Sequence, residues 1–511
     1  MRQSYRLIYN AIVGWVSRLV ESGISFLLLP FLVHRLGTAG YGVFALALSV
    51  SAALDFVRVG VAAALTKYVS NYDAQGRHDD INRVIGTTCA FGIAVGSIGG
   101  ASVIGLSGVL ADAFNVAVAE RAEFELAVKL MGVLIAVSFP MMPYLGLLLG
   151  FQRYDLMRIS QTIVRALRAG LMVAWFLLCY PSVTALAIIT LIFGAGLHSV
   201  WLAIAHRKWP WLRGSPRQFR WVTFRLLLGF STMMILIQLT TLMTYHATLW
   251  IAAAMISVDF VTHVTVMITP VAFLVLLIHD VTMTVMPAAS KYQALGDRSA
   301  LADLLIRGTR YSFLISAALV VMFVPIMGPL LRLWMGPDFE ILAQPMTLVV
   351  ICAGLSASEL CAHNILKGLG KAGPILWRGI ASSVIGLAIT AVAIKWYGAT
   401  SWAISLGIAT RCVISALLHN WMCIAAIRAP VCRFVWRSYA QPAIVLAPIL
   451  AAGWLAGREL DLYGLATMGL AGVGAVLLFG LVFAALFLSS DEYDLIRGIW
   501  HSARSRLSQQ S

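Results

Sequence analysis

The sequence predicts an all-α polytopic membrane protein with about fourteen transmembrane helices. Its composition is the first reason: of 511 residues, 60% are hydrophobic and only 12% are charged, whereas soluble domains carry roughly 25% charged residues. The second reason is that apolar runs recur along the whole chain. Each run is long enough to cross a hydrocarbon core of about 30 Å, because a helix rises about 1.5 Å per residue.

The predicted spans are separated by short segments that carry basic residues, glycine or proline. "HRLGTAG" divides the first two spans, and the basic segment "HRKWPWLRGSPRQFRW" precedes the seventh. The first seven spans cover residues 8–33, 41–65, 84–110, 126–150, 159–180, 184–205 and 226–256. The other seven cover residues 261–288, 308–335, 346–366, 375–396, 402–427, 439–457 and 464–488.

The distribution of Lys and Arg predicts the orientation, because positively charged loops stay on the cytoplasmic side. With the N-terminus inside, 26 of the 37 basic residues fall in inside segments and six fall outside. Both termini are therefore expected in the cytoplasm, and the acidic segment "ADAFNVAVAERAEFE" is expected to be the longest external loop. The net charge of +15 then reflects contact with anionic lipid headgroups. We expect no nucleic-acid partner.

Two sequence echoes indicate a duplicated six-helix unit. "TKYVSNYDAQGRHDD" is echoed by "SKYQALGDRSALAD" with Lys67 and Lys291 aligned, and "LLLGFQRYDL" by "ILKGLGKAGPI" with Gly150 and Gly368 aligned. Such repeats are typical of secondary transporters that bind substrate between two halves near the bilayer midplane. We expect a first lobe and basic linker over residues 1–222, a second lobe over 223–432, and two extra helices with a cytoplasmic tail over 433–511.

Several charged residues lie inside the predicted spans, where each costs about 2.5–3.5 kcal/mol at a helix centre. They must therefore face one another or water. Five are arginines and four are acids: Arg18, Arg58, Arg165, Arg168, Arg411, Glu21, Asp55, Asp280 and Glu359.

Helical spacing places some of these charges on shared faces. Arg18 and Glu21 share a stripe on the first span, and Asp55 and Arg58 share one on the second. These pairs either lock helices together or line a substrate path. Arg411 lies near the middle of the twelfth span.

For the other charges two interpretations stay open. Arg165 and Arg168 either line a cavity or extend back to the cytoplasmic interface, whereas Asp280 is expected at the interface. Glu359 and His363, four residues apart, form either a proton relay or a hydrogen-bonded pair. The glycines of the third span, Gly92, Gly96 and Gly100, are expected to pack helices.

No chemistry-bearing motif rises above chance. The sequence has no nucleophile–base set, no metal-ligand spacing and no phosphate-binding glycine loop, so we expect no enzymatic activity, metal or cofactor. The seven cysteines show no zinc-like pairing. A membrane-embedded sugar polymerase or ligase would need a sizeable external loop, and no predicted external loop exceeds about fifteen residues, against typical connections of 2–6.

The chain resembles the polysaccharide transporter family of the MATE-like (MOP) flippases. The resemblance lies in "LLLPFLVHRLGTAGYGVFALALSVSAALDFVRVGVAAALTKYVSNYDAQGR", "LGFQRYDLMRIS", "LLRLWMGPDF" and "LSSDEYDLIRG". It implies two lobes around a cationic central cavity, alternating access and coupling to an ion gradient. By position it implies that Arg18, Arg58 and Arg411 bind pyrophosphate. The near balance of intramembrane acids and bases departs from the expected cationic cavity.

The sequence therefore predicts a bacterial inner-membrane flippase for undecaprenyl-pyrophosphate-linked oligosaccharides, with membrane lipids, a polysaccharide polymerase and export machinery as partners. Arginines would bind the pyrophosphate, while Gln238, Thr241, Tyr245 and Thr248 would meet sugar hydroxyls. Glu21, Asp55, Glu359 and His363 would pair charges or couple an ion. The alternative is an ion-coupled drug or cation antiporter of the same fold, which the surplus of arginine over acid disfavours.

Overall fold

The computed structural model describes residues 2–459 and 464–487, and every regular element within them is helical. The first ten α-helices are α1 (Arg2–Ala74), α2 (His78–Gly105), α3 (Ser107–Ala113), α4 (Val118–Ser138), α5 (Met142–Gly150), α6 (Tyr154–Leu178), α7 (Val183–Lys208), α8 (Trp221–Met255), α9 (Val258–Thr282) and α10 (Val285–Ala294). The others are α11 (Arg298–Phe323), α12 (Met327–Met335), α13 (Ala343–Ala357), α14 (Leu360–Gly368), α15 (Ala372–Tyr397), α16 (Ser401–Ile427), α17 (Val431–Val435), α18 (Gln441–Glu459) and α19 (Leu465–Phe487).

The helices confirm the predicted membrane class. Within the described residues, 12 helices are long and apolar enough to cross a bilayer, or up to 13 if the bent pair in α8 forms one span. One of the 12 covers Val13–Ala74, which contains the second predicted span and all of the first from residue 13 on. It is interrupted at Gly37, whose φ of 74° favours glycine. The count of fourteen spans stays a prediction.

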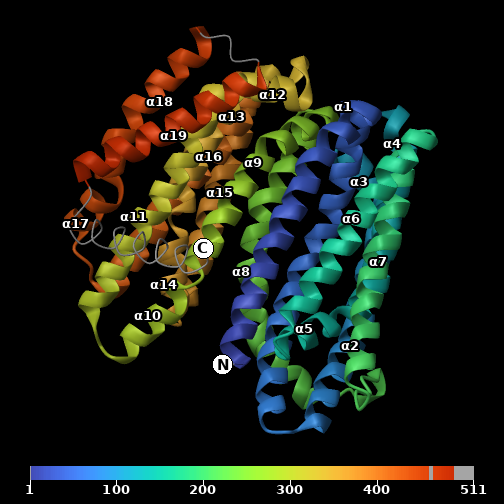
Figure 1. Cartoon of the computed structure of the whole chain (residues 1–511). Coiled ribbons are helices and arrows are strands. Elements are labelled where there is room, and N and C mark those ends of the chain that lie inside the picture. The colour runs from blue at the N-terminus through green and yellow to red at the C-terminus, as the bar shows by residue number, and fades with distance from the viewer. Residues whose placement is uncertain (1, 460–463, 488–511) are drawn as a thin grey trace, which may run out of the picture. The chain divides into compact units, whose positions relative to one another are not determined.

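The chain divides into two compact units (Figure 1). Unit 1 comprises residues 1–270 and 375–411, and unit 2 comprises residues 271–374 and 412–511. Within unit 1, α1 packs against α4, α6 and α8, and α7 packs against α4 and α6. The predicted division at residues 222 and 432 stays a prediction, as does the predicted orientation. The predicted tail lies outside the described residues.

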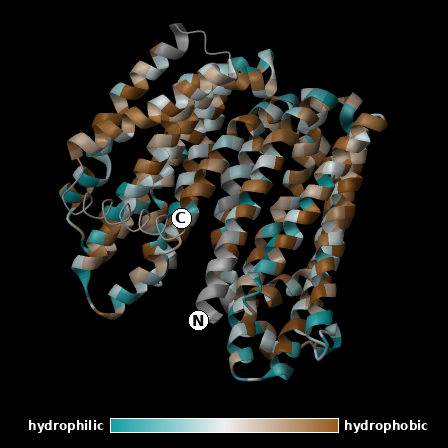
Figure 2. Ribbon diagram, viewed as in Figure 1, coloured by the Kyte–Doolittle hydropathy of each residue, from teal (hydrophilic) through white to brown (hydrophobic). Residues whose placement is uncertain are grey.

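The distribution of hydrophobic residues along the helices is typical of a membrane protein. Figure 2 shows hydrophobic residues along the middle of the helices of unit 1 and hydrophilic residues at the turn between α1 and α2. Large exposed apolar side chains such as Leu27, Ile98, Leu167 and Leu178 are 58–85% exposed, which suits contact with lipid. Glycines permit close packing elsewhere: a Cβ at Gly100 would lie 2.6 Å from the carbonyl oxygen of Gly132. This confirms the packing role predicted for the glycine row of α2.

The internal repeat recurs in the positions of the helices. Helices α14, α15 and α16 begin at Leu360, Ala372 and Ser401, which is 218 residues after the starts of α5, α6 and α7 at Met142, Tyr154 and Val183. The turn that follows α5 repeats as well, because Arg153 N donates to Leu148 O and Lys371 N donates to Leu366 O.

The first echo needs a correction. Arg77 N donates to Tyr72 O, and Asp297 N donates to Tyr292 O, so the offset between these turns is 220 rather than the 224 obtained by aligning Lys67 with Lys291. The cause is that a polar residue followed by tyrosine occurs twice in the first copy, as Lys67-Tyr68 and, one helical turn later, as Asn71-Tyr72. "SNYDAQG" is the true counterpart of "SKYQALG".

The span predicted over residues 126–150 lies within the apolar span Val118–Gly150. Inside it, a 3₁₀ turn at Phe139–Met141 that contains Pro140 separates α4 from α5. Proline has no N–H to continue the hydrogen-bond ladder. The predicted fifteen-residue external loop is mostly helical, since α3 ends at Ala113 and α4 begins at Val118.

Candidate functional site

Unit 1 contains a polar cavity of about 230 Å³. Helices α1, α4, α6 and α7 supply its walls, and its charged lining residues are Asp55, Arg58, Arg165 and Arg168. At about 30 Å³ per water molecule, the cavity has room for roughly eight waters. We call it the unit 1 cavity. Charged groups that would be costly in contact with lipid therefore face a space that water or a polar ligand can fill.

Arg58 is held from two sides at the wall of this cavity. Its Nη2 lies 3.0 Å from Asp55 Oδ2, one turn earlier on α1, and its Nη1 lies 2.8 Å from Nε2 of His198 on α7. His198 Nδ1 lies 2.8 Å from the carbonyl oxygen of Gly194. Because that carbonyl can only accept, Nδ1 carries the proton and Nε2 accepts from Arg58. The imidazole is thus neutral and orients the guanidinium without balancing its charge.

A second ion pair links α1 to α6 beside the cavity. Arg165 Nη1 lies 2.7 Å from Glu21 Oε2, and Thr162 Oγ1 donates to Glu21 Oε1 at 3.0 Å. The Glu21 side chain is only 9% exposed, whereas Arg165 is 43% exposed. Glu21 therefore bonds across the helix interface to Arg165. Arg18 interacts electrostatically with both Glu21 and Arg158.

The charges of this region do not cancel. The named charges of this region are five arginines, Arg18, Arg58, Arg158, Arg165 and Arg168, against two acids, Asp55 and Glu21, so arginine is in surplus by three. Arg168 lines the cavity, and its Nε is buried without a hydrogen-bond partner in the part of the chain that the structure describes. A buried N–H without an acceptor costs about 1–3 kcal/mol.

The structure brings together some of the predicted site residues and separates others. Asp55, Arg58, Arg165 and Arg168 share the unit 1 cavity, whose described lining does not include Arg411, Gln238 or Tyr245. Arg411 packs on α15 in unit 1, because a Cβ at Gly386 would lie 2.6 Å from Arg411 Cβ. On α8, Gln238 and Tyr245 are half-buried and Thr248 is buried, while the side chain of Thr241 lies outside the described residues.

Glu359 and His363 lie in unit 2. Glu359 is 6% exposed and accepts a hydrogen bond of 2.6 Å from Ser415. The side chain of Asp280, expected at the interface, lies outside the described residues.

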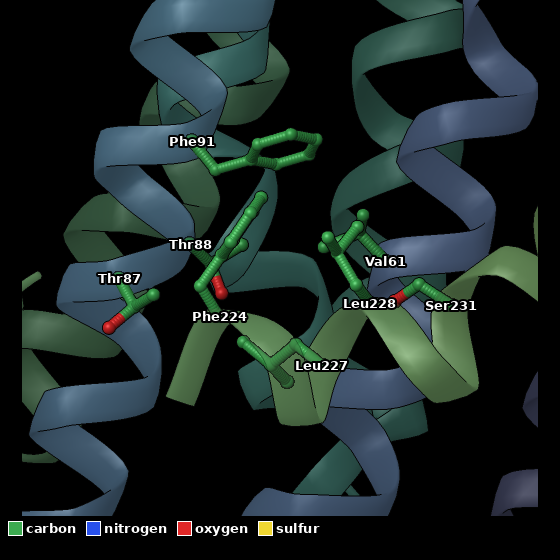
Figure 3. A pocket seen from close by; sticks show the side chains of 8 residues that line it. All are labelled: Val61, Thr87, Thr88, Phe91, Phe224, Leu227, Leu228 and Ser231. Carbon is green, nitrogen blue, oxygen red and sulfur yellow. The ribbon is translucent and has the colours of Figure 1, made fainter. Parts of the chain in front are cut away.

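Figure 3 shows a second pocket in unit 1, formed by α1, α2 and α8. Its volume is about 10 Å³, and its walls are mostly apolar. The rings of Phe91 and Phe224 pack inside it with centroids 5.4 Å apart. This volume holds at most one water, so the pocket is a packing gap beside α8.

Sequence reasoning missed His198, Arg158 and Thr162. His198 is a single histidine in an otherwise apolar span, "TALAIITLIFGAGLHSVWLAIA", and that isolation was the available signal. Arg158 was assigned to the inside loop after the fourth span, because the helix was predicted to begin at residue 159 and begins at Tyr154. One extra turn of helix brings Arg158 to the level of Arg18.

In residues 2–459 and 464–487, no group of three or more His, Cys, Asp or Glu side chains is placed to hold a metal ion. The cavity offers guanidinium N–H donors, an amide and hydroxyls instead. Such donors suit an oxyanion.

Comparison with known proteins agrees with this architecture. No protein-family model matches the chain. A curated relative from Shigella flexneri, "Putative O-antigen transporter", is 21% identical over 419 residues, which cover 81% of this chain and 97% of the relative.

Two solved structures share the fold at low sequence identity. An inward-facing multidrug resistance MATE transporter of the MOP superfamily has a TM-score of 0.66 at 12% identity, covering 82% of this chain and 99% of the other. The lipid II flippase MurJ has a TM-score of 0.64 at 11% identity, and the match covers 94% of this chain and 99% of the MurJ chain. The resemblance seen in the sequence is confirmed, and the chain has the fold of the MATE and MurJ transporters of the MOP superfamily.

Proposed function

We propose that this protein is a flippase that moves undecaprenyl-pyrophosphate-linked oligosaccharides across the bacterial inner membrane by alternating access. The fold supports a transporter, and two of the similar proteins are named for lipid-linked or O-antigen cargo. The observation that carries the proposal is the surplus of arginine at the unit 1 cavity. It favours a substrate that carries negative charge.

A pyrophosphate fits the donors that the cavity presents. Arg58, Arg165 and Arg168 line it together with Gln161 and Ser51. Guanidinium groups bind phosphate oxygens in pairs, and desolvating a phosphate inside the membrane requires such donors to replace water. Arg18 and Arg158 extend the positive region along α1 and α6. Arg411 and the polar residues of α8 stay proposed contacts to the pyrophosphate and the sugars.

The two ion pairs stabilise the cavity when no substrate is bound. Burying a lone arginine is costly, and pairing Arg58 with Asp55 and Arg165 with Glu21 lowers that cost. Substrate phosphate would compete with the carboxylates for the same guanidinium groups. Exchange of partner then links binding to a change in the packing of α1 against α6 and α7.

The alternative, a drug or cation antiporter, has less support from the site. A cationic substrate would meet three arginines and one carboxylate in the lining of the cavity, and like charges disfavour its binding. The same fold serves multidrug transport in the MATE relative, so the fold does not decide between the two functions.

A deletion strain tests the proposal in the cell. We expect its lipid extracts to accumulate undecaprenyl-pyrophosphate oligosaccharide on the inner leaflet, and a plasmid copy of the gene to reverse this. A copy that carries Arg168→Gln should fail to reverse it. A copy that carries Arg121→Gln should succeed, because Arg121 pairs with Asp112 and Glu125 at the end of α4 that is away from the unit 1 cavity. Unchanged lipid pools together with altered drug tolerance would support the antiporter instead.

A further inference from the structure

The segment that joins α7 to α8 carries exposed positive charge. Residues 207–225, which run from the end of α7 to the start of α8, contain five arginines, one lysine and no acid. All six basic side chains are exposed. We call this segment the basic platform, and its basic residues are Arg207, Lys208, Arg213, Arg217, Arg220 and Arg225.

Three other arginines at this end of unit 1 are neutralised by neighbouring acids. Arg77 and Arg83 both bind Asp80, at 2.6 and 2.9 Å, and Arg153 binds Asp155 at 2.7 Å. The five arginines of the platform differ, because none of them has an ion pair with an acid in residues 2–459 and 464–487. Their charge is therefore available to an external anion.

The platform is folded against the start of α2 (Figure 1). The indole of Trp211 stacks on the imidazole of His78, with ring centroids 4.0 Å apart and an angle of 4° between the ring planes. Asn82, which is 6% exposed, donates from Nδ2 to Trp211 O at 3.3 Å and accepts the N–H of Arg213 at Oδ1, at 2.7 Å. One buried amide thus fixes the backbone on both sides of Leu212.

A second anchor lies about one turn further along α2. The N–H of Arg220 donates to Oγ1 of Thr87 at 3.3 Å, and Thr87 is 1% exposed. Between the two anchors, a Cβ at Gly86 would collide with the carbonyl oxygen of Ser215. The anchors hold backbone N–H groups, which leaves the guanidinium groups of Arg213 and Arg220 exposed. The arrangement is therefore formed before any ligand binds.

Exposed apolar side chains adjoin these charges. Helix α7, which is long and apolar enough to span a membrane, ends at Lys208, and the apolar helix α8 begins at Trp221. Phe219, Trp221 and Val222 are 43%, 56% and 80% exposed. The guanidinium of Arg225 lies 5.5 Å from the ring centroid of Trp221. Since aromatic residues at the ends of membrane helices lie at the level of the headgroups, the platform is placed at the surface of the bilayer.

The chemistry of the platform fits the headgroup of an anionic phospholipid. Guanidinium groups bind phosphate oxygens as paired donors, and each basic residue near a membrane surface adds to the attraction of anionic lipid. Exposed apolar side chains beside the charges suit the boundary between headgroups and acyl chains. A soluble acidic protein or a nucleic acid would bind the charges but would leave these apolar side chains in water.

We infer that the basic platform is a preformed binding site for the headgroups of anionic phospholipids, in the leaflet that meets the end of α7 and the start of α8. Its ligand is a lipid of the surrounding membrane rather than the cargo. The inference is therefore independent of the proposed flippase function.

Native mass spectrometry of the full-length protein in detergent tests the binding. The affinity for phosphatidylglycerol should exceed that for phosphatidylcholine with the same acyl chains about tenfold or more. Arg213→Gln with Arg220→Gln should remove most of this preference. The fold should persist in this double variant, because the anchors use only the backbone N–H groups of the two residues. Equal affinity of the wild type for the two lipids would overturn the inference.

A matched pair of variants separates the platform from diffuse positive charge. Arg77→Gln with Arg83→Gln removes the same charge at the same end of unit 1, but from arginines that Asp80 already neutralises. The preference for phosphatidylglycerol should therefore persist. An equal loss of preference in the two double variants would refute a specific site.

Asn82→Leu tests whether the fold of the platform matters. This variant removes no charge but detaches the backbone of the platform from α2. The affinity for phosphatidylglycerol should fall about threefold, because the arginines are no longer held in place before the lipid binds. Gel filtration checks that the variant is folded, and an unchanged affinity in the folded variant would refute a preformed site.

Photo-crosslinking identifies the occupant in the native membrane. A photo-reactive residue in place of Val222, which is 80% exposed, should attach to phospholipid. Mass spectrometry of the adduct should identify an anionic glycerophospholipid. An adduct with an undecaprenyl carrier, another protein or a nucleic acid, with no glycerophospholipid attached, would contradict the inference.

Discussion

Arg58 illustrates how a charge is tolerated inside a membrane helix. It sits one turn from Asp55 and opposite His198, with its side chain 22% exposed. The sequence "LDFVRVG" predicted the pair with Asp55, because residues three apart share a helix face. It could not predict His198, which is 140 residues away. Spacing along one helix can be read from the sequence, whereas the partner across an interface depends on the packing.

Replacing Arg58 separates a substrate-binding role from a structural ion pair. Arg58→Ala should lower flipping about 10- to 100-fold, because it removes a charge-assisted donor worth roughly 1.5–3 kcal/mol. Arg58→Lys should keep partial activity through its charge alone. Complementation of glycan export, with protein abundance checked in the membrane, measures both. Full rescue by the double variant Asp55→Ala, Arg58→Ala would show that the pair is only structural.

His198 should act as a positioning residue for Arg58. His198→Leu removes the acceptor for the guanidinium, so flipping should fall about tenfold, the equivalent of about 1.4 kcal/mol. His198→Gln supplies an amide oxygen as acceptor and should retain most of the activity. The same complementation assay compares the two. Equal loss in both variants would indicate that bulk at this position, rather than the hydrogen bond, matters.

At the scale of elements, long apolar helices were predicted well and their interruptions were not. Hydropathy identifies the span over residues 126–150 but not the 3₁₀ turn at Pro140 that divides it. Likewise it identifies the span over residues 346–366 but not the break at Ser358 and Glu359 that separates α13 from α14. Hydropathy averages over a window as long as a span, so a local change in hydrogen bonding leaves no trace in it.

The glycine row on α2 gives a prediction about helix packing. Gly100→Leu should destabilise unit 1 by about 1–3 kcal/mol or more, because the new side chain would meet the backbone of α4 at Gly132. Gly105→Leu is the matched control on the same helix, where a Cβ meets nothing within 4 Å. Thermal unfolding of the detergent-solubilised protein, monitored by gel filtration, should show a loss of stability for Gly100→Leu and none for Gly105→Leu. Equal stability of the two variants would refute the packing role.

At the scale of the whole molecule, the basic loops predict the orientation. In a cysteine-free background, a cysteine at Pro216 in the exposed basic loop should resist an impermeant thiol reagent in intact spheroplasts, whereas one at exposed Ala119 should react. The physical reason is the retention of Lys and Arg on the cytoplasmic side. Labelling of the cysteine at position 216 would show that the topology is the reverse of the predicted one.

The site was predictable only in part at this scale. Arg58, Arg165 and Arg168 can be identified from the sequence because a charged residue stands out in an apolar span. That these three arginines line one cavity is seen only in the structure. Unit 2 shows the same limit: Glu359 and His363 stand out on one helix, but Ser415 contacts Glu359 and His419 contacts His363 from 56 residues later in the chain.

Reconstituted transport tests the central claim most directly. Purified protein in liposomes, supplied with labelled undecaprenyl-pyrophosphate oligosaccharide on one leaflet, should move the label to the other leaflet and leave the molecule chemically intact by mass spectrometry. The arginine-rich cavity predicts that this transport exceeds any uptake of organic cations. Label that stays on its original leaflet, or that is recovered as a shortened, extended or dephosphorylated product, would contradict the account.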